Sequence, residues 1–139
     1  MQTKKARVGL WTVQGLLAAL FLFAGTMKLI VPIEALTQQV ALPGWFLRFI
    51  GTCEVLGAIG LILPAALRIF PILTPLAAAG LLVIMTGAAA ITAAEANVAE
   101  AIVPAVVGVL CMVVIYGRQS ATIAGPAIQV IQPIRSRPN

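Results

Sequence analysis

The chain has 139 residues, of which 61% are hydrophobic and 9% are charged, and its net charge is +5. Its mean hydropathy is +1.08. Because soluble domains carry about 25% charged residues, these values exclude an ordinary soluble domain and indicate an integral membrane protein. A helix needs about 20 apolar residues to cross about 30 Å of hydrocarbon, and the sequence contains four such runs. We therefore predict an all-α membrane protein with four transmembrane helices.

Several function classes are disfavoured by what the sequence lacks. The basic residues are dispersed at the ends of apolar runs, which does not favour a nucleic-acid partner. There is no histidine, so imidazole cannot bind haem or a metal or serve in acid–base catalysis. Cys53 and Cys111 lie in different apolar runs, which favours two buried thiols over a disulfide or a redox motif. With no nucleotide loop or nucleophile elbow, the sequence favours a protein that is not an enzyme and has no metal or cofactor.

The first predicted span covers residues 8–31 and is ended by Pro32. Three basic residues precede it, as they would in a secretory signal peptide: Lys4, Lys5 and Arg7. The apolar stretch is longer than the 7–15 residues of a signal-peptide core, and no clear cleavage site follows it. We therefore expect a retained first helix.

A short segment over residues 33–43 separates the first two spans. Its apolar residues Ile33, Leu36 and Val40 recur at helical spacing, which is typical of a short helix lying in the membrane interface. The segment is too short to cross the bilayer. A loop is the alternative.

Prolines mark the predicted boundaries of the next two spans. The second span is predicted over residues 45–63, ending before Pro64. The third is predicted over residues 75–94, with Thr74 as its N-cap, although it could begin at Pro71.

The fourth span is predicted over residues 98–116. The remaining tail is interrupted by Gly125 and Pro126, so we expect it to be partly disordered or to lie on the membrane surface. The predicted organisation is a four-helix transmembrane domain over residues 1–118 and a cytoplasmic tail over residues 119–139.

The basic residues predict the orientation of the chain. Two of the nine fall on one side of the membrane, at Lys28 and Arg48. The other seven fall on the opposite side: Lys4, Lys5, Arg7, Arg68, Arg118, Arg135 and Arg137. Because positive charge is retained in the cytoplasm, we expect both termini to be cytoplasmic and the protein to reside in the cytoplasmic (inner) membrane.

Two charged residues lie where lipid would surround them. Lys28 is about 4.5 Å below the outer edge of the first span, and Glu54 is about 13 Å below the same edge in the second. A carboxylate at that depth costs about 2.5–3.5 kcal/mol unless it is compensated, so we expect the two side chains to pair. Lys28 could instead extend to the lipid headgroups. Glu54 could form a structural ion pair, donate a hydrogen bond as a protonated acid, or form the floor of an outward-facing pocket.

Other residues are secondary candidates. Arg48 lies six residues before Glu54, off its helical face, so extension to the outer headgroups is the main alternative to pairing. Arg118 marks the exit of the fourth span. Small residues let other backbones approach the first two spans closely, among them Gly25, Gly51 and Gly57.

Four segments together resemble the DoxX-like family of four-helix membrane proteins. They are residues 23–29, residues 42–44, residues 50–64 and Arg118. The resemblance extends over about residues 14–118.

This resemblance implies a four-span bundle in which the lysine of the first helix and the glutamate of the second correspond to Lys28 and Glu54. The wider group includes DoxX and DoxD proteins, linked to quinone-dependent thiosulfate oxidation and oxidative-stress complexes, and the receptor-assembly factor NACHO. Many members carry a histidine late in the third helix, where this chain has Thr86, Ala90 and Thr92. The resemblance therefore does not extend to a histidine-dependent redox role.

Two functional hypotheses follow. The first is a bilayer-embedded protein that binds or assists assembly of other membrane proteins, with a membrane-protein partner or a second copy in a homodimer. The alternative is an accessory membrane subunit of a quinone-linked oxidoreductase complex, with quinone as a possible cofactor. A pore or carrier that uses Glu54 as a protonatable site is less favoured in so small a bundle.

Overall fold

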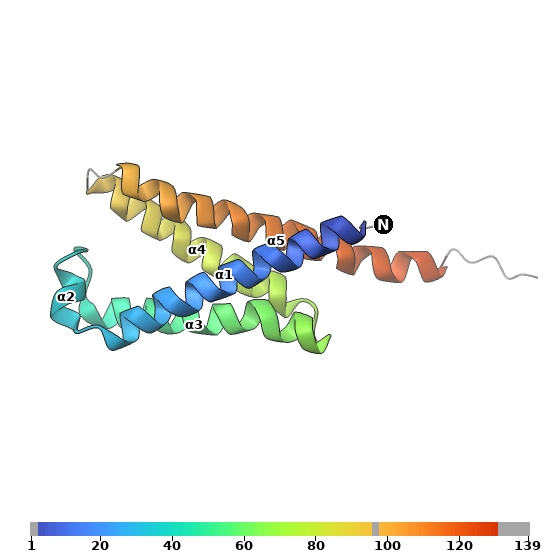
Figure 1. Ribbon diagram of the computed structural model, residues 1–139, viewed down its shortest axis with the longest axis horizontal. Coiled ribbons are helices and arrows are strands. Elements are labelled where there is room, and N and C mark those ends of the chain that lie inside the picture. The colour runs from blue at the N-terminus through green and yellow to red at the C-terminus, as the bar shows by residue number, and fades with distance from the viewer. Residues whose placement is uncertain (1–2, 96–97, 131–139) are drawn as a thin grey trace, which may run out of the picture.

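The computed structural model describes residues 3–95 and 98–130, with side chains described as far as residue 120 (Figure 1). Over these residues the chain is helical and contains no strand. The helices are α1 (Lys4–Ile30), α2 (Ile33–Thr37), α3 (Gly44–Leu67), α4 (Leu73–Ala94) and α5 (Val98–Val130). Four of them are long and apolar enough to cross a membrane, namely α1, α3, α4 and the Val98–Ser120 part of α5. The predicted all-α, four-span membrane fold is confirmed.

The four long helices form two pairs. Helix α1 packs along α3, and α4 packs along α5, while α3 also packs against α4 and α1 makes a smaller contact with α5. In Figure 1 the two pairs lie close together toward the N-terminal end and diverge toward α2. The buried core where the pairs meet is built mainly from Leu17, Phe21, Leu61, Leu81, Cys111 and Val114.

Polar and proline residues determine how α1 begins and ends. The Thr3 side chain accepts a hydrogen bond from the Ala6 amide, so the helix begins one turn earlier than predicted. At its other end Val31 is extended, as the residue before Pro32 must be.

The predicted end of the second span at Pro64 is wrong, because α3 continues through this proline to Leu67. Proline removes only one backbone hydrogen bond, here to the Gly60 carbonyl, and membrane helices tolerate this when neighbouring helices supply other partners. Arg68 caps the end of the helix in a left-handed conformation, with a φ of 55°.

The predicted N-cap of the third span is also wrong. Helix α4 begins at Leu73, so Thr74 lies inside the helix rather than before it. Its side chain is buried, and within the described residues its hydroxyl has no hydrogen-bond partner.

The length of the short helix after the first span and the position where the last helix ends also differ from the predictions. Helix α2 is present but is only five residues long, with the rest of the connection in turns. Helix α5 continues to Val130, past the predicted end of the fourth span at residue 116 and across the expected boundary after residue 118. The remainder of the expected tail, residues 131–139, lies outside the described residues.

Candidate functional site

The ion pair between α1 and α3 is the central polar feature of the half of the bundle near α2. Lys28 Nζ lies 2.8 Å from Glu54 Oε2 and 3.1 Å from Oε1, so it donates to both carboxylate oxygens. The Glu54 side chain is 2% exposed, whereas that of Lys28 is 29% exposed. The prediction that these two residues meet is therefore confirmed, with the carboxylate inside the bundle and the ammonium group at its edge.

Two glycines bring the helices close enough for this contact. A Cβ atom on Gly25 would lie 2.7 Å from the Gly51 carbonyl oxygen, and one on Gly51 would lie 2.9 Å from Lys28 Cβ. Neither position therefore accepts a larger residue without movement of the backbone. Gly25 precedes Lys28 by three residues and Gly51 precedes Glu54 by three, so the close crossing lies one turn from the ion pair. The third glycine predicted to pack helices, Gly57, faces α4, where an added Cβ would lie 2.7 Å from a Leu81 methyl group.

Arg48 binds the end of α1. Its Nη1 donates to the Lys28 carbonyl at 2.9 Å, and its Nη2 donates to the Val31 carbonyl at 3.0 Å. The last carbonyls of a helix have no partner within the helix, and they carry partial negative charge that a guanidinium neutralises. Arg48 therefore fixes the backbone that carries Lys28, a role that the sequence did not predict.

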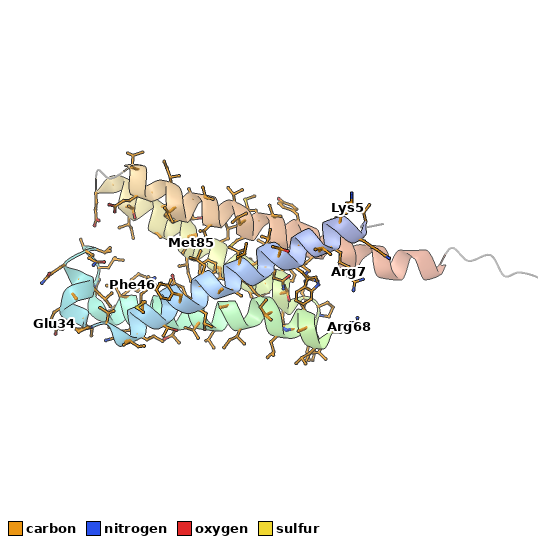
Figure 2. All side chains as sticks on the ribbon, viewed as in Figure 1. Lys5, Arg7, Glu34, Phe46, Arg68 and Met85 are labelled. Atoms are coloured by element: carbon orange, nitrogen blue, oxygen red, sulfur yellow. The ribbon has the colours of Figure 1, made fainter. Side chains whose placement is uncertain are left out.

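The ion pair forms part of the wall of a pocket of about 380 Å³ between the two helix pairs. Figure 2 labels Phe46 and Met85, which line this pocket from α3 and α4. The lining is otherwise mostly apolar and comprises Lys28, Val40, Leu42, Phe46, Leu47, Phe49, Ile50, Cys53, Glu54, Val83, Ile84, Met85, Gly87, Ala88, Ile91 and Thr92. We refer to this cavity as the Lys28 pocket.

A contact between the helix pairs lies next to the Lys28 pocket. The backbone amide of Ala41 donates to Glu95 Oε1 at 3.3 Å, joining the connection before α3 to the end of α4. Val40 and Leu42, on either side of Ala41, both line the pocket. This contact therefore holds that connection against the cavity.

A second polar centre joins α1, α3 and α5, and sequence reasoning missed it. Gln14 is fully buried, and its Nε2 donates to the Leu61 carbonyl. Its Oε1 accepts hydrogen bonds from Arg118, whose guanidinium also lies 4.9 Å from the centre of the Trp11 ring. The available signal was one uncharged amide inside an apolar run.

The two polar centres lie in different halves of the bundle. Lys28 and Gln14 are 14 residues apart on α1, which is about 21 Å along a helix. Arg118, a secondary candidate, therefore lies with Gln14 and not with the ion pair. Within residues 3–95 and 98–120, no three side chains of the metal-binding types His, Cys, Asp and Glu are grouped closely enough to hold an ion.

The family comparison covers most of the membrane-spanning part of the chain. The model of the DoxX-like family matches residues 12–114. This range contains both residues of the ion pair, Arg48 and Gln14, and it ends before Arg118. No curated protein and no solved structure gives a significant match.

Proposed function

This chain belongs to the DoxX-like family, and on that premise we propose that it binds other membrane proteins and assists their assembly. The observation that carries this proposal is a groove between α3 and α4, the least buried of the four spans, whose lining includes small as well as large apolar residues. The groove has a volume of about 610 Å³. Its lining includes Gly57 and Gly60, which already pack against Leu81 and Ala77 of α4, and Gly80, which remains open to a further helix.

Small residues in such a groove favour association with a further helix. In lipid there is no hydrophobic driving force between helices, so they associate where small side chains allow close van der Waals packing. Gly80 and Gly87 are both exposed, and an added Cβ at either would have nothing within 4 Å. They lie seven residues apart, or about two turns, so they share one face of α4, with Gly80 in the groove and Gly87 in the lining of the Lys28 pocket.

Filling the groove tests this proposal. The full-length protein is purified in mild detergent from the membranes of its own host, and stoichiometric partners are quantified. Gly80→Leu places a bulky side chain in the groove and is expected to reduce partner recovery at least tenfold. Gly15→Leu is the matched control, because Gly15 on α1 also has nothing within 4 Å of an added Cβ and does not line the groove. Equal recovery with both variants, or a wild-type chain that purifies alone, would contradict the proposal.

A second copy of this chain is one partner that the groove would accept. Co-expression of two differently tagged chains distinguishes a homodimer from a complex with another protein. A homodimer is recovered with both tags in one particle, and Gly80→Leu in both chains is expected to abolish it.

The alternative of an accessory subunit in a quinone-linked oxidoreductase complex predicts different partners. Its purification would return a redox enzyme together with quinone, and quinone reduction would depend on that enzyme. Recovery of non-redox membrane proteins without quinone would favour the assembly role.

The distribution of charge supports the proposed orientation in the cytoplasmic membrane. Lys5, Arg7 and Arg68 lie at the end of the bundle opposite Glu34 (Figure 2). We propose that the end with Lys5 and Arg7 faces the cytoplasm, because basic residues accumulate on that side. Cysteine-accessibility labelling at Thr3 and Gln38 tests this, with Thr3 expected to be protected in intact cells.

A further inference from the structure

We propose that the Lys28 pocket binds an uncharged amphiphile whose hydrogen-bond-accepting head contacts the ammonium group of Lys28. The ligand class is a lipid-soluble molecule with a carbonyl or ester oxygen at one end and an apolar body. This inference does not depend on the α3–α4 groove being a protein-binding surface, because it derives from the ion pair and the cavity beside it.

The number of donors on Lys28 supports recognition of an accepting head. An ammonium group has three N–H donors, and Glu54 Oε1 and Oε2 accept from it at 3.1 and 2.8 Å. Lys28 also lines the cavity and is partly exposed, while Glu54 is almost fully enclosed. A ligand oxygen can therefore approach the ammonium group from the cavity without displacing the carboxylate.

Charge balance selects an uncharged ligand. The lysine and the glutamate neutralise each other, so a ligand with a net charge would bring an uncompensated charge into a largely apolar cavity. Among the pocket residues, Lys28 and Glu54 are the only ones with ionisable side chains besides the thiol of Cys53. Outside the lining, the carboxylate of Glu95 and the guanidinium of Arg48 add one charge of each sign, which leaves this balance unchanged.

The position and size of the cavity fit the rest of such a molecule. Lys28 lies about 4.5 Å below the outer end of the first predicted span, at the depth where polar heads of lipid-soluble molecules meet hydrocarbon. The volume of about 380 Å³ is in the range of small-molecule pockets, about 300–1,000 Å³, and it is enough for the head and the first part of a long chain. Phe49 and Val83 in the lining are exposed, so the rest of the chain can extend into the surrounding lipid. Leu47, Ile50, Ile84 and Ile91 provide apolar walls for the body of the ligand.

Direct binding tests the inference on the full-length protein in lipid nanodiscs. Native mass spectrometry would compare three probes: dioleoylglycerol, a long-chain quinone and the anion oleate. At least one uncharged probe is expected to bind at least tenfold more tightly than oleate. Tighter binding of dioleoylglycerol would identify the ligand as a membrane glycerolipid. Tighter binding of the quinone would identify it as a ketone that diffuses within the bilayer. Equal or tighter binding of oleate, or no binding of either uncharged probe, overturns the inference.

Two variants of the ion pair sharpen the test. Glu54→Gln keeps the size of the side chain and leaves Lys28 unbalanced, so the preference is expected to reverse toward oleate. The double variant Lys28→Met with Glu54→Leu removes both charges, and it is expected to weaken the uncharged probes about tenfold without improving oleate. An uncharged probe that binds this folded double variant as tightly as wild type would overturn the proposed contact with Lys28.

Discussion

The Oε1 atom of Gln14 accepts two hydrogen bonds from Arg118, one from Nε at 3.0 Å and one from Nη2 at 2.6 Å. These residues are 104 positions apart, on α1 and α5, which have only a small packing contact with each other. The same amide donates to the Leu61 carbonyl of α3. One side chain therefore connects three helices at the end of the bundle opposite the ion pair.

We predict that Gln14→Leu destabilises the fold by about 2–3 kcal/mol, because it leaves a guanidinium and a buried carbonyl without this partner. Thermal unfolding in detergent measures the change as a lower midpoint. Thr12→Val is the control, since the Thr12 hydroxyl is exposed and binds only the Val8 carbonyl of its own helix among the contacts described. A midpoint for Gln14→Leu equal to that of the control would show that this connection does not stabilise the bundle.

Substitution at the glycine crossing is predicted to separate α1 from α3. In Gly25→Ala the new methyl group would lie 2.7 Å from the Gly51 carbonyl oxygen, and the backbone must move to relieve the overlap. We expect a loss of about 1–3 kcal/mol, as for other overpacked interiors. Gly15→Ala, at an open position on the same helix, is expected to be neutral or slightly stabilising. The fraction of unfolded protein, measured for both variants over the same denaturant concentrations, provides the comparison.

The ion pair was predictable from the sequence because the bilayer leaves few alternatives. A carboxylate as deep as Glu54 must find a partner within the bundle, and Lys28 was the nearest cation on the adjacent span. The contact between Gln14 and Arg118 was not predictable on the same ground. An amide is uncharged, and its partner depends on how α1 crosses α5, which local sequence does not determine.

The errors at helix ends have a related cause. Pro64 and Thr74 were interpreted with rules for helices in water, where proline ends a helix and threonine caps one. In this bundle both residues are buried inside helices. Exposed backbone groups are unfavourable in lipid, so a membrane helix tends to continue where a soluble one would stop.

The contact of Arg48 with the end of α1 predicts a local effect. Arg48→Met removes the donors to the Lys28 and Val31 carbonyls, so the last turn of α1 should open more readily. Hydrogen exchange of the amides of residues 28–31 and 33–36 is expected to accelerate about tenfold, while exchange in α5 stays unchanged. Arg68→Met, at the opposite end of α3, serves as the control. Faster exchange throughout the protein would point instead to global destabilisation.

The ion pair itself predicts a non-additive double-mutant cycle. Lys28→Met alone leaves the Glu54 carboxylate enclosed without its cation. We expect this to lower the free energy of unfolding by about 2–4 kcal/mol. The loss is smaller than for a fully buried ion pair, because Lys28 is partly exposed. The double variant with Glu54→Leu removes both charges and is expected to recover at least half of that loss. Chemical unfolding of Lys28→Met, Glu54→Leu and the double variant in the same detergent measures the coupling. If the losses simply add, the two charges do not interact in the folded protein, and Glu54 must be stabilised by another group.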